Sequence, residues 1–187
     1  DLAGNEGALV VAVVRDIVEP RLTLISPKSG DVINTARVDL LVHVSEGGCA
    51  LLVDGERLDA TDIGAGRMRA TLTLRGGDGV KVLFLRAEDL AGNPGEARLM
   101  LDLDTTAPSI GLIGLSDGAR VTTEPLEVRG TTEARAKVVW VNDVMADLES
   151  DGSFRATLRL AEGHKEIRVR AIDRANNAKD IFYYEIQ

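Results

Sequence analysis

A five-residue motif returns along this chain at nearly constant spacing, and this repeat constrains the fold more than any other feature of the sequence. Asp1–Asn5 reads Asp-Leu-Ala-Gly-Asn, the same residues return at Asp89–Asn93, and a weaker copy occupies Asp173–Asn177. A motif that returns at a fixed spacing marks copies of one structural unit. The sequence therefore predicts two complete units that follow the last segment of a third.

The similarity between the units extends across the intervals between the motifs. Pro20 and Pro108 stand at matching places after the motif, and Arg69–Leu74 matches Arg155–Leu160. From this alignment we predict that residues 1–20 form the last strand and linker of a preceding repeat. Residues 21–104 are predicted to form the first domain, and residues 105–187 the second.

Each unit reads as a series of short strands. Apolar and polar residues alternate with a period of two, and turn residues separate the runs, which is the pattern of an all-β sandwich. In the first unit we expect strands at Leu22–Ile25, Val38–Val44, Cys49–Val53, Arg67–Leu74, Val80–Glu88 and Ala97–Leu103. In the second unit we expect them at Ser109–Ile113, Leu126–Arg129, Lys137–Val141, Ser153–Leu160, Lys165–Ile172 and Ile181–Ile186.

A set of landmarks occurs in order in the second unit: Asp104–Pro108, Gly118, Gly130–Glu133, Val139–Asn142, Asp151–Phe154, Glu162–Gly163 and Ala171–Asn177. Together they resemble the bacterial immunoglobulin-like family named after the B domain of glucodextranase. The first unit resembles it less well, because His43–Glu46 stands where the second unit has Gly130–Glu133. The resemblance implies two tandem immunoglobulin-like β-sandwich domains in a secreted or envelope-anchored protein, and it transfers no catalytic residue.

Charge and hydropathy exclude several classes of partner. The formal net charge of −8 disfavours binding to phosphate backbones, so no nucleic acid is expected. No apolar run approaches the roughly 20 residues that cross a bilayer, so no membrane span is expected. The expected partners are the neighbouring immunoglobulin-like repeats of the same chain, further copies in a homo-assembly, or a surface glycan or protein.

Residues that would support catalysis do not form a recognisable pattern. The two histidines, His43 and His164, lack the near neighbours of a metal site, and alternation places Cys49 inward as a small hydrophobe. The glycine-rich run Arg75–Gly79 lacks the residues of a phosphate-binding loop and is predicted to be a hairpin turn. We therefore predict that the chain is not an enzyme.

The acidic residues around the repeated motif allow two interpretations. In the first, the aspartate and asparagine of the motif bind backbone amides within the turn and have a structural role. In the second, oxygen ligands bind calcium near the boundary between the units, and the candidate ligands are Glu88, Asp89, Asn93, Asp102 and Asp104. The first interpretation needs no cofactor and the second needs calcium, and Val14, which occupies the place of Asp102 in the preceding copy, counts against calcium.

A few apolar side chains are expected to point outward from their strands. If Val139 and Val141 face the core, Trp140 faces away from it, and the same count places Leu52, Val82 and Phe84 on one outer face of the first unit. These four residues are the candidates for partner binding, and the alternative is that loops or an adjoining repeat cover them.

The predicted function is a non-catalytic structural or adhesive module in a cell-surface or secreted protein. The location expected for it is extracellular or on the cell surface. The alternative is an accessory domain, with carbohydrate binding as one role, in a secreted enzyme that acts on polysaccharides.

Overall fold

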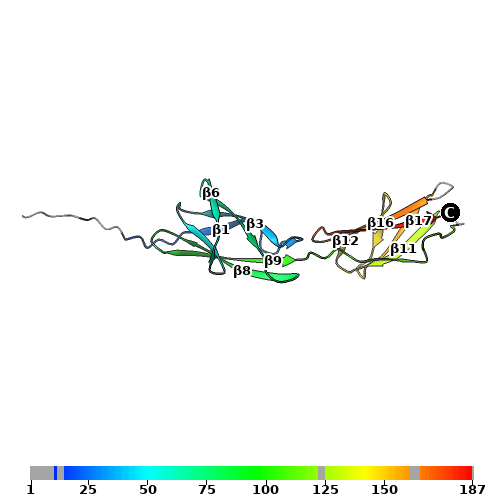
Figure 1. The fold of residues 1–187 in the computed structure, drawn as a ribbon, viewed down its shortest axis with the longest axis horizontal. Helices are drawn as coiled ribbons and strands as arrows, with labels where there is room; N and C mark the ends of the chain where they lie inside the picture. Colours follow the sequence, from blue (N-terminus) through cyan, green and yellow to red (C-terminus); the bar gives the residue numbers. More distant parts are fainter. Residues whose placement is uncertain (1–10, 12–14, 122–124, 161–164, 187) are drawn as a thin grey trace, which may run out of the picture. The chain divides into compact units, whose positions relative to one another are not determined.

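The computed structural model describes residue 11 and residues 15–121, 125–160 and 165–186, and every regular element among them is a β-strand (Figure 1). The predicted first segment, residues 1–20, lies mostly outside the described residues, and residues 15–20 of it contain no strand. The alternating pattern of the sequence thus produces the all-β structure that it predicts.

Residues 22–103 form two sheets, which we call the first sandwich. One sheet has the order β1-β3-β7-β6, and the other has the order β2-β9-β8-β4-β5. The strands are β1 (Leu22–Ser26), β2 (Val32–Ile33), β3 (Arg37–Val44), β4 (Ala50–Val53), β5 (Glu56–Arg57), β6 (Ala60–Gly64), β7 (Arg67–Thr73), β8 (Gly79–Glu88) and β9 (Pro94–Leu103). The short strand β2 pairs in parallel with the end of β9, whereas β1 with β3, β4 with β5 and β8, and β6 with β7 pair antiparallel.

Residues 110–186 form the second sandwich, which again has two sheets. Their orders are β10-β11-β15-β14 and β13-β12-β16-β17. The strands are β10 (Ile110–Ile113), β11 (Leu126–Thr132), β12 (Ala136–Val141), β13 (Val144–Met145), β14 (Asp147–Leu148), β15 (Ser153–Leu158), β16 (Lys165–Asp173) and β17 (Ala178–Ile186).

Each sandwich buries alternate side chains between its sheets. Every second residue of β3 is buried, from Val38 to Val44, and β8 contributes Leu83, Leu85 and Ala87 to the same core. The second core includes Val139 and Val141 of β12 together with Ile167 and Val169 of β16, all with no exposed surface. Burial of this kind stabilises each sandwich through the hydrophobic effect, at about 25 cal/mol per Å² of apolar surface.

Equivalent tight turns close the two sandwiches. Gly66 and Gly152 both have positive φ, +70° and +87°. The backbone N–H of Val44 donates to the carbonyl oxygen of Gly66, and that of Thr132 donates to Gly152. A Cβ atom would stand 2.6 Å from the Val44 oxygen at the first glycine and 2.2 Å from the Thr132 oxygen at the second. Both positions therefore require glycine.

The structure corrects two expectations from the sequence. The run Arg75–Gly79 is not a hairpin turn, because β7 and β8 lie in different sheets and the run connects them. The sequence also missed short strands such as β6, which is almost entirely exposed and therefore lacks an alternating pattern. The expected main strands, in contrast, coincide with observed ones to within a few residues.

The most compact division of the chain differs from the division by sheets. It assigns residues 30–38 and 73–81 to the unit that contains residues 100–187. The domain boundaries at residues 21–104 and 105–187 therefore stay a prediction.

Candidate functional site

The repeated motif forms the same turn in both sandwiches. In the Asp–Asn turn at Asp89–Asn93, one carboxylate oxygen of Asp89 accepts hydrogen bonds from the N–H groups of Ala91 and Asn93, at 2.9 and 2.8 Å. The other oxygen accepts a bond from the Asn93 amide at 2.8 Å. The hydrogen bonds from Asn93 hold the pKa of Asp89 below its usual value, with burial opposing the shift.

The second Asp–Asn turn, Asp173–Asn177, has equivalent contacts. Asp173 is fully buried, and its carboxylate accepts bonds from the backbone N–H and the side-chain amide of Asn177, at 2.8 and 2.9 Å. This geometry is the structural role that the first interpretation of the motif predicts.

The asparagine of each turn also binds a residue well before it in the sequence. The Asn177 amide donates to the backbone oxygen of Asp104 at 2.7 Å, and the Asn93 amide donates to that of Asp16 at 3.4 Å. Asp104 and Asp16 are equivalent positions, each four residues before the proline of its unit. The asparagine of each turn therefore holds the segment that precedes its unit against the turn.

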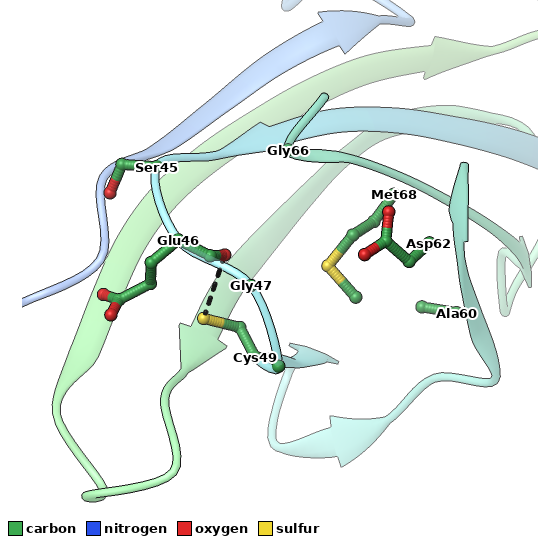
Figure 2. Close-up of a pocket in the computed structure, with 9 residues that line it drawn as sticks. Ser45, Glu46, Gly47, Cys49, Ala60, Asp62, Gly66 and Met68 are labelled. Atoms are coloured by element: carbon green, nitrogen blue, oxygen red, sulfur yellow. Dashed lines mark hydrogen bonds between the residues drawn. The ribbon is translucent and has the colours of Figure 1, made fainter. Parts of the chain in front are cut away.

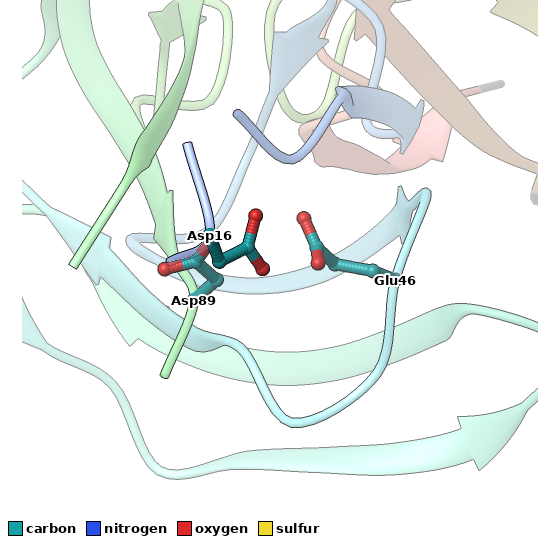
Figure 3. Close-up of side chains that lie close together, drawn as sticks. All are labelled: Asp16, Glu46 and Asp89. Carbon is teal, nitrogen blue, oxygen red and sulfur yellow. The ribbon is translucent and has the colours of Figure 1, made fainter. Parts of the chain in front are cut away.

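Three carboxylates gather at the first Asp–Asn turn. Asp16 comes from the segment before β1, Glu46 from the loop between β3 and β4, and Asp89 from the turn after β8 (Figure 3). Their oxygen atoms lie within 4.8 Å of one another. Repulsion between them is relieved by protons, by hydrogen bonds or by a cation, and hard oxygen ligands suit calcium.

Of the five calcium candidates from the sequence, this cluster contains only Asp89. Asn93 binds within the turn, and Glu88 pairs with Arg86 at 3.0 Å. Asp102 and Asp104 lie at and just after the end of β9. Calcium binding stays a prediction. The repeat places aspartates equivalent to Asp16 and Asp89 in the second unit, at Asp104 and Asp173, but the strand register aligns Glu46 with Ala134, so the repeat offers no signal for Glu46.

A hollow of about 330 Å³ lies beside this cluster in the first sandwich (Figure 2). Glu46 and Cys49 of one loop line it together with Asp62 of β6 and Met68 of β7. Cys49 donates from its thiol to the backbone oxygen of Glu46 at 3.7 Å. Burial and the nearby Glu46 and Asp89 carboxylates raise the pKa of Cys49, so the thiol stays protonated and is a poor nucleophile.

The four partner-binding candidates lie on the outer faces that the sequence predicts. In the first sandwich, β4 and β8 are neighbours, Leu52 is partly buried, and the exposed fractions of Val82 and Phe84 are 37% and 63%. In the second sandwich, Trp140 is 36% exposed between the buried Val139 and Val141. Partner binding by these residues stays a prediction.

Trp140 borders a second hollow, of about 320 Å³, which the sequence did not reveal. The hollow lies on the outer face of the sheet β13-β12-β16-β17, and its lining also includes Asn142, Asp143, Arg168, Arg170 and Ile172. Arg170 lies opposite Trp140 in the strand register. Its buried Nε atom, like that of the equivalent Arg86, has no hydrogen-bond partner among the described residues.

Within the part of the chain that the structure describes, no helix has the length and apolar character needed to cross a bilayer.

Comparisons with known proteins agree with the repeat and the fold. The family model for glucodextranase domain B matches residues 108–183, which confirms the resemblance seen in the second unit. No curated protein matches the chain in sequence.

Solved structures with two tandem modules also match. The fibronectin(III)-like modules of Clostridium thermocellum CbhA are 17% identical, with a TM-score of 0.53, and the match covers 89% of this chain and 94% of theirs. Murine CEACAM1b is 14% identical, with a TM-score of 0.43 and coverages of 90% and 99%. A chimeric titin Z1Z2 is 13% identical, with a TM-score of 0.36 and coverages of 91% and 99%.

Of these three structures, the CbhA modules alone are close enough to carry an argument, and at this identity they show the fold. The chain is therefore a pair of tandem immunoglobulin-like β-sandwiches, and its second sandwich matches the glucodextranase domain B family.

Proposed function

We propose that this chain is a non-catalytic structural module, a spacer or adhesive segment of a secreted or cell-surface protein. The observation that carries the proposal is the attachment repeated in both units. Asn93 binds the backbone of Asp16, and Asn177 binds the backbone of Asp104. A module that fixes the chain leading into it is suited to tandem arrays, in which each unit must hold its own connection.

The chemistry of the described residues supports a role other than catalysis. Cys49 is held as a thiol, and the acidic cluster of Asp16, Glu46 and Asp89 has no nucleophile paired with a base beside it. The buried side chains mainly form two apolar cores, which the tight turns close.

Single-molecule force spectroscopy tests the structural role. When the chain is held by its ends, we expect two separate unfolding events, because each sandwich has a core of its own. Asn177→Ala should lower the force of one event, and Asn93→Ala that of the other. One event that involves the whole chain, or gradual extension without a force peak, would contradict a role as an array of mechanical units.

Localisation needs a separate experiment. We expect antibodies against the chain to label intact, unpermeabilised source cells or to detect the protein in the culture medium. Detection only after the cells are opened would contradict a secreted or surface location.

The match to glucodextranase domain B also favours a second candidate, an accessory domain of a secreted enzyme that acts on polysaccharides. The family takes its name from a domain of an enzyme, and this candidate predicts a catalytic domain in the same polypeptide. Mass spectrometry of the protein isolated from its source would find such a domain if this candidate is correct.

A further inference from the structure

We propose that the hollow beside Trp140 binds an uncharged oligosaccharide. The hollow lies on the outer face of the second sandwich and is lined by Trp140, Asn142, Asp143, Arg168, Arg170 and Ile172. This proposal goes beyond the structural role above, because a spacer needs no ligand.

The backbone fixes the lining before any ligand binds. Asn142 has positive φ, +50°, at the turn between β12 and β13. Its N–H donates to the Arg168 carbonyl oxygen, and its side-chain oxygen accepts the Arg168 N–H, both at 2.8 Å. Trp140 and Arg170 then face each other across the β12–β16 pair. A lining fixed in this way loses little conformational entropy on binding.

The lining combines an aromatic surface with polar groups. Trp140 is 36% exposed, although its neighbours on β12 are fully buried, and Met145 lies opposite it on β13 with 62% exposed. An indole ring offers a flat apolar surface against which the C–H face of a sugar ring can pack. Around it, Asn142, Asp143 and Arg170 offer planar donors and acceptors that suit paired hydroxyl groups.

The charges around the hollow favour a neutral ligand. The Nε atom of Arg168 lies 2.8 Å from Asp180, and this guanidinium also lies 5.8 Å from the centre of the Phe182 ring. Asp143 lies in the lining with Arg170. Asp180, Glu166 and Asp143 all act on Arg168, so nearby carboxylates offset the positive charge of the two arginines, and this disfavours a phosphate or a carboxylate as the ligand. The volume, about 320 Å³, is at the small end of ligand clefts and suits one or two sugar rings.

The first sandwich has the same framework with different side chains. Asp54, also at positive φ, accepts the N–H of Phe84 through its side chain at 2.9 Å, as Asn142 does for Arg168. Leu52, however, occupies the position of Trp140, and it lies opposite Arg86, the equivalent of Arg170. The proposal therefore assigns the site to the second sandwich alone, and Phe84, the exposed aromatic residue of the first, provides a matched control.

Tryptophan fluorescence tests the proposal directly, because Trp140 is the only tryptophan in the chain. The full chain is titrated with neutral hexasaccharides of glucose, xylose and mannose, and with oligogalacturonate and chitosan oligosaccharides as charged comparators. We expect a saturable change in emission with at least one neutral oligosaccharide and none with the charged ones. Stronger binding of a charged comparator, or no saturable change with any neutral probe, would overturn the proposal.

Calorimetric titration of variants then locates the site. Trp140→Ala and Arg170→Lys should each weaken binding by about tenfold or more, as expected for central contacts. Trp140→Phe should restore part of the affinity, and Phe84→Ser should leave it unchanged. Unfolding curves show whether each variant is folded. Unaltered affinity in a folded Trp140→Ala variant, or loss of affinity in Phe84→Ser, would refute the assignment. Sedimentation that shows a dimer dependent on Trp140 would also refute it, because a second copy of the chain would then cover this face.

Discussion

Removal of the Asn177 side chain should destabilise the second sandwich strongly. Asn177→Ala deletes one hydrogen bond to the fully buried Asp173 carboxylate, at 2.9 Å, and one to the Asp104 oxygen, at 2.7 Å. A bond to a charged group contributes about 1.5–3 kcal/mol, and a neutral one about 0.5–1.5 kcal/mol. The expected loss in the free energy of unfolding is therefore about 2–4.5 kcal/mol.

Urea denaturation followed by tryptophan fluorescence measures this loss. The only tryptophan, Trp140, lies in β12, so its signal reports the second sandwich. Asn93→Ala, the equivalent change in the first sandwich, should leave the fluorescence transition within about 0.5 kcal/mol of the wild type. Circular dichroism, which reports all strands, should detect its effect instead.

A control variant separates the lost hydrogen bonds from general disturbance of the turn. Asn176 has a φ of +68°, and Gly92 occupies the equivalent position with a φ of +89°. Asn176→Gly should therefore leave the second sandwich at least as stable as before. A fluorescence transition that is unchanged in Asn177→Ala, or displaced equally in Asn93→Ala, would refute the role assigned to the turn.

Three further predictions concern the turns and the charges. Gly152→Ala should destabilise the second sandwich by about 1–3 kcal/mol, because the new Cβ would clash with the Thr132 oxygen and the backbone has a φ of +87°. Equal urea midpoints for the variant and the wild type would contradict this. Hydrogen bonds from Ser153 and Arg168 lower the pKa values of Asp151 and Asp180, so these two carboxylates stabilise the fold above the ordinary aspartate pKa. This stabilisation is lost as the pH falls through the lowered pKa values. A pH series of unfolding curves should show the loss of stability in acid, and stability that rises toward low pH would disprove it. The calcium prediction requires that calcium raise the unfolding midpoint of the first sandwich and that Glu88→Gln, which removes one of the predicted ligands, reduce the rise, whereas calorimetry that gives the same midpoint with calcium and with chelator would exclude it.

The strands were predictable because burial on one face leaves an alternating pattern. Strands β3 and β8 show that pattern clearly, with every second residue of β3 buried. Strand β6 does not, since it lies at a sheet edge with almost all of its side chains exposed. The crossing from β7 to β8 was misread because a glycine-rich run looks the same whether it joins neighbours in one sheet or passes between two.

The candidate sites were predictable only in part. Alternation was sufficient to place Trp140 outward, but the hollow beside it depends on the turn at Asn142 and on the position of Arg168 in the next strand. The acidic cluster joins Asp16, Glu46 and Asp89 from three separate segments. Proximity of this kind comes from the fold and not from sequence spacing, although the repeat places aspartates equivalent to Asp16 and Asp89 in the second unit.

The hairpins that begin at Asp54 and Asn142 suggest how such modules acquire new specificities. In each, the turn residue holds the adjacent strand through its own side chain, at 2.9 Å in one sandwich and 2.8 Å in the other. The outward side chains beside the turn take no part in these bonds, which use backbone N–H groups, so the side chains can vary without loss of the framework. A library that randomises positions 52, 84 and 86 should therefore yield folded variants, and a selection from it would be a direct route to a designed binding face on the first module.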